Sequence, residues 1–202
     1  MKSSNVADRD TAERVLATAS RLFYAHGVRA VGVEWIVADS GVAKTSLYRH
    51  FATKDDLVAA FLESEDREFW GQWDEVVRTS AASPLSELMA ILDWVGQRVS
   101  RDGYRGCPQI NVAAEFSDPD HPARRIRREH KAEMYARLKG LVTRMKLRRS
   151  EDVALQIALL IDGAFTSDGR LTRSIASRVL QNAGRALIDA GRPMRRTASA
   201  RS

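Results

Sequence analysis

The sequence predicts an all-α protein of about nine helices. Nearly every segment carries apolar residues at helical spacing, and no stretch shows the convincing alternation of apolar and polar residues expected of a half-buried strand. A chain of 202 residues is also long enough to hold two compact units. We expect a three-helix N-terminal head over residues 1–53, a helical domain over residues 54–191, and a disordered basic tail over residues 192–202.

The first expected helix runs from about Asp10 to His26, after a loose polar stretch over residues 1–8. Gly27 ends it, because glycine reaches left-handed backbone angles at little cost. Its apolar stripe is formed by Val15, Leu16, Ala19, Leu22 and Phe23. This helix therefore presents one buried face to the rest of the head.

A second, short helix is expected over residues 34–40, and Gly41 then supplies a turn before a third helix that opens at Lys44. Leu47 and Phe51 lie four residues apart and form one narrow apolar stripe on the third helix. A helix, a glycine turn and a second helix are typical of a helix-turn-helix, whose second helix enters the major groove of DNA.

The remaining faces of the third helix carry hydroxyl groups, an aromatic ring and cations. Lys44, Arg49 and Lys54 are its only charged residues up to Asp55, and the whole chain has a net charge of +6. Cations and hydrogen-bond donors favour an anionic partner such as double-stranded DNA. The expected DNA contacts are Lys44, Thr45, Ser46, Tyr48, Arg49, His50 and Lys54.

Residues 40–57, and in particular the pattern Leu47-Tyr48-x-x-Phe51-x-x-Lys54, resemble the DNA-binding signature of the TetR family of bacterial transcriptional regulators. The resemblance covers about the first quarter of the chain. It implies a helix-turn-helix head, a C-terminal domain for effector binding and dimerisation, and phosphate contacts from Tyr48, His50 and Lys54.

The second helix departs from the family pattern. Serine or threonine is common in the family where this chain has Val31 and Gly32, and a polar or basic residue is common in place of Glu34. A carboxylate is repelled by phosphates unless it accepts a hydrogen bond from a cytosine amino group. We therefore expect either a smaller contribution of this helix to DNA affinity, which we favour, or readout of cytosine.

The C-terminal domain is expected to contain six helices. Thr53 is a good N-cap for a helix that continues to about Arg78, and Ser83-Pro84 starts the next. The others are expected over residues 108–116, 123–145, 151–166 with Ser150 as cap, and 171–190. The resemblance implies an effector pocket among these helices, and aromatic side chains suit a small, largely apolar ligand. The candidate pocket residues are Trp70, Trp73, Trp94, Cys107, Asn111, Phe116, Tyr135 and Phe165, with ordinary core packing as the alternative for each.

The helix expected over residues 151–166 is apolar nearly all round, although a helix at the edge of a small domain buries only one face internally. Either it is central to the monomer, or a partner chain covers its second face. The resemblance implies the second arrangement, a homodimer whose two heads read a palindromic operator. The expected interface residues are Leu155, Ala158, Leu159, Phe165, Ile175, Val179 and Leu187.

Basic residues crowd the helix expected over residues 123–145, and they form either a solvated face or a second anionic-ligand surface. No motif of an enzyme, a cofactor site or a metal site is present, so we expect none of the three. Neither a secretion signal nor a membrane span is apparent, which favours the cytoplasm. Two alternative functions remain: a thiol-based redox sensor using Cys107, and a protein that organises DNA without sequence preference.

Overall fold

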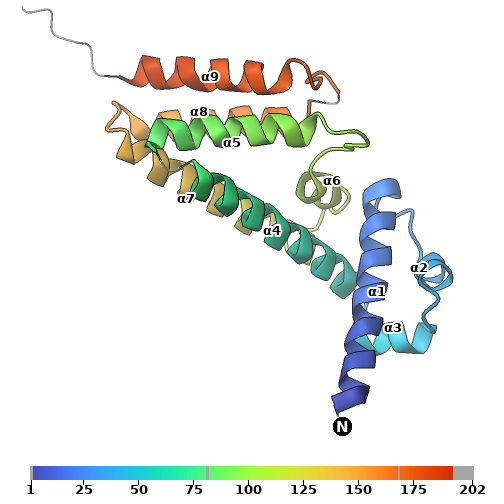
Figure 1. Ribbon diagram of the computed structural model, residues 1–202. Coiled ribbons are helices and arrows are strands. Elements are labelled where there is room, and N and C mark those ends of the chain that lie inside the picture. The colour runs from blue at the N-terminus through green and yellow to red at the C-terminus, as the bar shows by residue number, and fades with distance from the viewer. Residues whose placement is uncertain (1, 81, 168, 193–202) are drawn as a thin grey trace, which may run out of the picture. The chain divides into compact units, whose positions relative to one another are not determined.

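The computed structural model describes residues 2–80, 82–167 and 169–192, and side chains from residue 8 onward. Over these ranges the regular secondary structure is helical, which confirms the all-α prediction (Figure 1). The described helices are α1 Lys2–His26, α2 Val33–Ser40, α3 Lys44–His50, α4 Lys54–Thr79, α5 Pro84–Val99, α6 Pro108–Ala114, α7 Pro122–Arg144, α8 Ser150–Phe165 and α9 Ala176–Gly191. The predicted basic tail, from residue 193 onward, lies outside the described residues.

Two helix starts differ from the prediction. The prediction of a loose stretch over residues 1–8 is wrong, because α1 already begins at Lys2. Extending an existing helix costs far less than starting one, and an ion pair from Asp8 to Arg49 of α3 holds these first turns. Conversely, α9 begins five residues later than predicted. The backbone N–H groups of Ile175 and Ala176 both donate to the carbonyl of Thr172 there, so the chain forms a turn before the helix begins.

Two other boundaries also differ. Ser150, predicted as a cap, is the first residue of α8, because Arg149 adopts the left-handed conformation (φ 52°) immediately before it. The backbone N–H of Arg148 donates to the carbonyl of Gly191 at 2.7 Å and ties this turn to the end of α9. At α6, the helix ends at Ala114 rather than Phe116, because the backbone N–H of Glu115 donates to Val112 and tightens the last turn.

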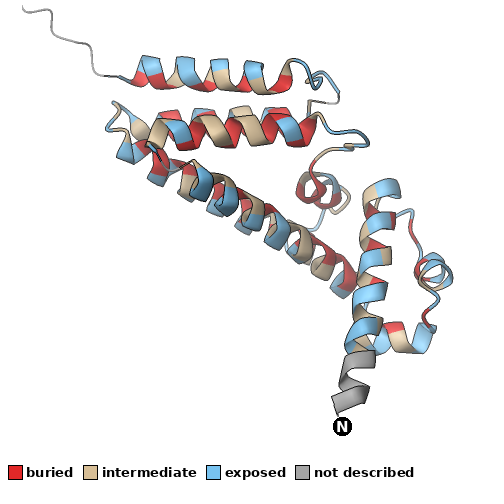
Figure 2. Cartoon of the chain, in the orientation of Figure 1, coloured by how far each residue is buried: buried red, intermediate tan, exposed pale blue. Residues whose placement is uncertain are grey.

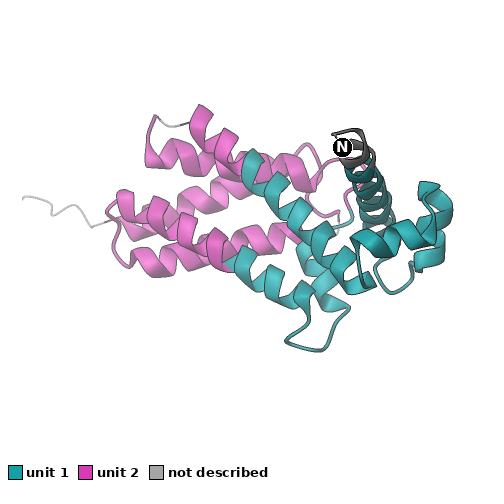
Figure 3. Ribbon diagram, turned by 90° about the horizontal axis from the view of Figure 1, so that it is seen from below, with its two compact units in different colours: residues 1–72, 105–131 teal, residues 73–104, 132–202 magenta. Residues whose placement is uncertain are grey.

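The chain divides into two compact units (Figure 3). Unit 1 contains residues 1–72 and 105–131, and unit 2 contains residues 73–104 and 132–202. Unit 1 therefore includes α6 and the beginning of α7 in addition to the head. The boundary predicted after residue 53 was drawn between expected functions and does not coincide with these packing units; it stays a prediction.

The core of unit 1 is one buried cluster that reaches from α1 to α7. Phe23 of α1 packs against Phe61 of α4, with ring centroids 5.9 Å apart. Val112 of α6 and Ile126 of α7 belong to the same cluster. Burying apolar surface stabilises by about 25 cal/mol per Å². Removing α6 would therefore uncover part of the core on which the head rests.

Unit 2 is built on α5, α8 and α9, which pack against one another. Figure 2 shows the buried face of α9 turned toward α5 and α8 and its exposed face turned away. The approach of α5 to α9 is so close at Gly96 that an added Cβ would lie 2.6 Å from the backbone nitrogen of Ser177. Glu87 of α5, only 4% exposed, is paired through both carboxylate oxygens with Arg144 of α7.

Within the described ranges, every helix is too short or too polar to cross a lipid bilayer.

Candidate nucleic-acid interface

The turn between α2 and α3 has the geometry that its glycine predicts. Gly41 has φ +65°, in the left-handed region, and its N–H donates to the carbonyl of Val37 at 3.1 Å. Ile36 before the turn and Val42 and Leu47 after it are all buried. The turn therefore brings two short helices onto one apolar core and leaves the opposite face of α3 to solvent.

The outward face of α3 carries most of the predicted DNA contacts. Lys44, Thr45, Tyr48 and Arg49 are exposed, and Tyr48 keeps 42% of its surface accessible. Leu47, predicted to be core, is 1% exposed. An exposed tyrosine offers a flat apolar ring and a hydroxyl donor, which suits contact with the DNA backbone.

Two cations of α3 are already paired within the head. Lys44 Nζ donates to Glu34 Oε1 of α2 at 2.7 Å, and this hydrogen bond lowers the pKa of Glu34 and raises the pKa of Lys44. Arg49 donates to Asp8 of α1 at 2.5 Å. Both pairs are solvent-accessible, so phosphate groups can compete for these cations.

His50 and Lys54 are less accessible than the prediction of phosphate contacts supposes. The His50 side chain is 13% exposed, and its Nε2 lies 3.4 Å from a carboxylate oxygen of Asp8. Lys54 Nζ donates to the carbonyl of Val28 at 2.7 Å. Partial burial lowers the pKa of Lys54, against the opposing effects of the nearby Glu115 and Asp55 carboxylates. DNA contact by either side chain requires these partners to be exchanged, and it stays a prediction.

Helix α2 begins without a side-chain cap, as Gly32 in this position implies. Sequence reasoning missed the most exposed aromatic side chain of this helix, Trp35. It is 43% exposed, and its ring lies 4.8 Å from the ring of His26 at the end of α1. The signal that could have identified it was a large apolar residue directly before the buried Ile36, off the apolar stripe.

Comparison with known proteins agrees with this geometry. The family model described as bacterial regulatory proteins, tetR family, matches residues 15–61, which span the head and the first turns of α4. A solved TetR-family transcriptional regulator from Streptomyces coelicolor superposes with a TM-score of 0.84 at 26% identity, covering 92% of this chain and 97% of its own. Residues 15–61 form a TetR-family domain, and the chain has the fold of a solved TetR-family regulator. The helix-turn-helix of this chain is thus of the type found in TetR-family transcriptional regulators.

Two curated relatives, both described as HTH-type, match shorter segments. The transcriptional regulator LmrA of Bacillus subtilis is 29% identical over 116 residues, which are 57% of this chain and 62% of LmrA. The transcriptional repressor KstR2 of Mycobacterium tuberculosis is 31% identical over 77 residues, 38% of each chain. The matched regions thus span less than two thirds of these curated relatives.

The predicted effector residues of this chain are divided between the two units. Trp70, Cys107, Asn111 and Phe116 lie in unit 1, and Trp73, Trp94, Tyr135 and Phe165 lie in unit 2. Within unit 2, the rings of Trp73 and Trp94 meet edge to face, 6.1 Å apart. Within unit 1, the Phe116 ring stacks on His121 at 3.6 Å. These contacts are compatible with core packing as well as with pocket walls.

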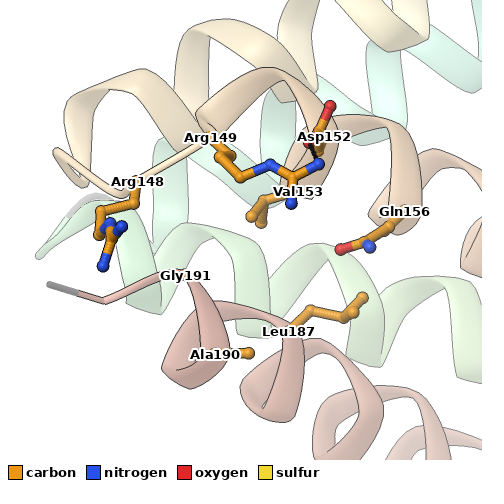
Figure 4. Close-up of a pocket in the computed structure, with 8 residues that line it drawn as sticks. All are labelled: Arg148, Arg149, Asp152, Val153, Gln156, Leu187, Ala190 and Gly191. Atoms are coloured by element: carbon orange, nitrogen blue, oxygen red, sulfur yellow. Dashed lines mark ion pairs between the residues drawn. The ribbon is translucent and has the colours of Figure 1, made fainter. Parts of the chain in front are cut away.

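Two cavities of about 260 Å³ are present in the described structure. The unit 1 cavity is lined by Phe23, Tyr24, Gly27, Phe61, Arg105, Pro108, Asn111, Val112 and Glu115, so Asn111 alone of the predicted pocket residues borders it. The unit 2 cavity is lined by Arg148, Arg149, Asp152, Val153, Gln156, Leu187, Ala190 and Gly191 (Figure 4). An ion pair of 2.5 Å joins Arg149 to Asp152 at its edge, and none of the predicted pocket residues lines it.

The predicted dimer residues fall into two groups. Leu155, Leu159 and Val179 are 51%, 62% and 39% exposed, so α8 and α9 present apolar side chains to solvent. Leu187 and Ile175 are partly buried, and Ile175 lies just before α9 rather than within it. Ala158 and Phe165 are buried within unit 2 itself. The exposed leucines are the residues that a partner chain could cover.

The basic residues of α7 are largely engaged within the chain. Arg125 pairs with Glu129 one turn later, Arg128 donates to the carbonyl of Pro119 at 2.6 Å, and Arg137 pairs with Asp74 and Glu133. These contacts favour a solvated, internally paired face over a second anionic-ligand surface.

Proposed function

We propose that the protein is a homodimeric repressor that binds a palindromic DNA operator and releases it when a small, largely apolar effector binds. The observation that carries this proposal is the exposed face of α3, which the Gly41 turn orients outward in a TetR-family domain. The repressor role is supported by the similarity to KstR2, itself a transcriptional repressor.

In this proposal α3 enters the major groove, which is wide enough for one helix. Thr45 and Ser46, near the N-terminus of α3, reach base edges or phosphates, while Tyr48 donates its hydroxyl to a phosphate oxygen. Phosphate contacts fix the position of the helix, and base contacts supply sequence preference. The paired cations Lys44 and Arg49 exchange their carboxylate partners for DNA phosphates on binding.

A homodimer is supported by the apolar groups that α8 and α9 leave exposed. Leu155 and Leu159 lie four residues apart on one face of α8, which is the spacing of a helix-packing stripe. A two-fold dimer places two heads on successive major grooves, about 34–36 Å apart, and so reads a palindrome.

The effector is proposed to bind among the aromatic side chains of the C-terminal helices, with the Trp73 and Trp94 pair as part of its wall. Such a ligand releases DNA only if it binds more tightly to a conformation that does not fit the operator.

The redox-sensing alternative finds no support in the position of Cys107. The thiol is 7% exposed at the start of α6, and thiols in apolar, buried surroundings are poorly reactive.

The test is selection of bound sequences from a random DNA pool, followed by anisotropy titrations at rising salt. A palindromic consensus and a steep linear loss of log affinity with log salt concentration are expected. Tyr48→Ala should weaken binding to consensus and altered sequences alike, whereas Thr45→Ala should reduce the preference for the consensus. Binding without any consensus would instead identify a DNA-organising protein.

A further inference from the structure

The carboxylate at the end of α6 binds the backbone directly after α1. Glu115 Oε1 accepts the N–H of Val28 at 2.9 Å, and Oε2 accepts the N–H of Arg29 at 2.8 Å. Glu115 follows α6 directly, and Val28 and Arg29 lie in the connection that leads from α1 to α2. Both oxygens of one side chain thus hold two successive peptide groups of the head.

The loop before α6 holds the preceding turn of α1. Arg105 Nη1 donates to the carbonyls of Tyr24, at 2.6 Å, and of Ala25. The Tyr24 hydroxyl accepts the N–H of Arg105 at 2.9 Å and donates to the carbonyl of Gly106 at 3.2 Å. Asn111 of α6 donates its side-chain amide to the Arg105 carbonyl at 2.8 Å, which fixes this loop to α6.

The two charges match the backbone groups that they bind. The last carbonyls of a helix lack intrahelical partners and carry partial negative charge, so a guanidinium is favourable there. The N–H groups beyond the helix end are bound by the carboxylate instead. The carbonyl of Val28 accepts a hydrogen bond from Lys54, the first residue of α4. Val28 is therefore bound at its N–H by Glu115, which follows α6, and at its carbonyl by α4.

We propose that Glu115 and Arg105 are positioning residues for DNA recognition. They fix the α1–α2 connection to α6 and thereby the direction in which α2 and α3 leave α1, without touching DNA themselves. This inference rests on the DNA-binding function proposed above. It gives α6 a role in orienting the helices of the head. A ligand that shifts α6 would also move the α1–α2 connection, and with it α2 and α3.

The sign of the change in DNA affinity on neutralising Glu115 distinguishes a positioning role from a purely electrostatic one. Glu115 is a negative charge in a head that binds a polyanion, so electrostatics alone predicts that its neutralisation strengthens DNA binding. Positioning predicts the opposite. Glu115→Gln keeps the size of the side chain but sets an amide NH₂ group against one of two N–H donors.

The experiment measures DNA affinity and amide hydrogen exchange in the full chain. Glu115→Gln is expected to bind the selected operator roughly tenfold more weakly. The dependence on salt should not change, because no phosphate contact is lost. Exchange should become faster at Val28, Arg29 and α2, while α8 and α9 keep their protection. The matched control is Glu129→Gln, which removes the same charge from an exposed site on α7 and should not weaken binding.

A second variant covers the possibility that Glu115→Gln does not fold. Tyr24→Phe changes no charge and deletes only the hydroxyl that links α1 to Arg105 and Gly106, so weaker DNA binding with an unchanged salt dependence is again expected. Equal or tighter binding by both variants, with unchanged exchange at Val28 and Arg29, overturns the positioning role. If the unaltered protein binds no DNA, the proposed function itself fails, and this inference fails with it.

Discussion

At the residue scale, two cations of α3, Lys44 and Arg49, are already paired with carboxylates of the head. Lys44, the first residue of α3, is hydrogen-bonded to Glu34 of α2, and this bond lowers the pKa of the carboxyl group. Glu34 therefore stays ionised at neutral pH and competes with phosphates for the ammonium group. We therefore expect Glu34 to lower DNA affinity in two ways, by holding Lys44 and by repelling the DNA backbone.

Glu34→Gln is accordingly expected to strengthen DNA binding, by roughly two- to tenfold at low salt, because Lys44 becomes available to a phosphate. The slope of log affinity against log salt concentration should steepen by up to about 0.9, the value for one additional phosphate contact. Anisotropy titrations of the operator at several salt concentrations measure both quantities.

Glu75→Gln is the matched control, since Glu75 is paired with Arg78 on α4 and its pKa is lowered in the same way. It should leave both affinity and slope unchanged. A weaker affinity for Glu34→Gln would mean that Glu34 itself contacts DNA, as in readout of a cytosine amino group.

At the element scale, the angle between α2 and α3 depends on one backbone conformation. Gly41 has φ +65°, and a Cβ built on it would meet no other atom within 4 Å. A substitution there adds no clash, so its effect reports the cost of the left-handed conformation alone.

Gly41→Ala should lower the free energy of unfolding by about 1 kcal/mol, measured by denaturant titration. It should also weaken DNA binding if the turn relaxes to a less costly angle. Gly71→Ala is the contrasting variant: Gly71 lies in the interior of α4, without positive φ or a neighbour within 4 Å, and alanine should stabilise by about 1 kcal/mol there. Equal effects of the two variants would show that backbone conformation does not govern the turn.

At the scale of the whole molecule, the exposed leucines of α8 form an apolar surface that a second copy of the chain could cover. Leu159 is 62% exposed and Leu155 is 51% exposed, whereas Ile157 and Ile161 of the same helix are fully buried within unit 2. Thus α8 has one apolar face satisfied inside the unit and another facing solvent. Two copies of this face, brought together by two-fold symmetry, would remove both from water.

Leu159→Glu should convert a dimer to a monomer in sedimentation velocity at micromolar concentration, because two carboxylates would be buried across the symmetry axis. Affinity for the full palindrome should fall, while affinity for an isolated half-site should be retained. Ala136→Glu adds the same charge at an exposed position of α7 and should remain dimeric. A monomeric unaltered protein at that concentration would contradict the dimer proposal.

Local sequence signals predicted the helix starts where a cap is complete within a few residues. Thr53 and Asp56 exchange side-chain and backbone hydrogen bonds at the start of α4, and the Ser83 hydroxyl accepts the N–H of Ser86 at the start of α5. The prediction failed at α9 because apolar periodicity alone does not reveal the turn that Thr172 forms by accepting the backbone N–H groups of Ile175 and Ala176. The predicted pocket and interface sets contain several residues that are buried inside a unit, because periodicity does not distinguish one buried face from another.

The sequence by itself determined the all-α class, the glycine turn between α2 and α3, and the polar face of α3. These features depend on periodicity and on caps, which act over a few residues. Only the tertiary structure decided which partners hold that helix in place. Glu115 binds Val28 from 87 positions away, and Lys54 and Lys44 meet partners on other helices. Such contacts arise from the packing of α6 and α4 against the head, and no local pattern encodes that packing.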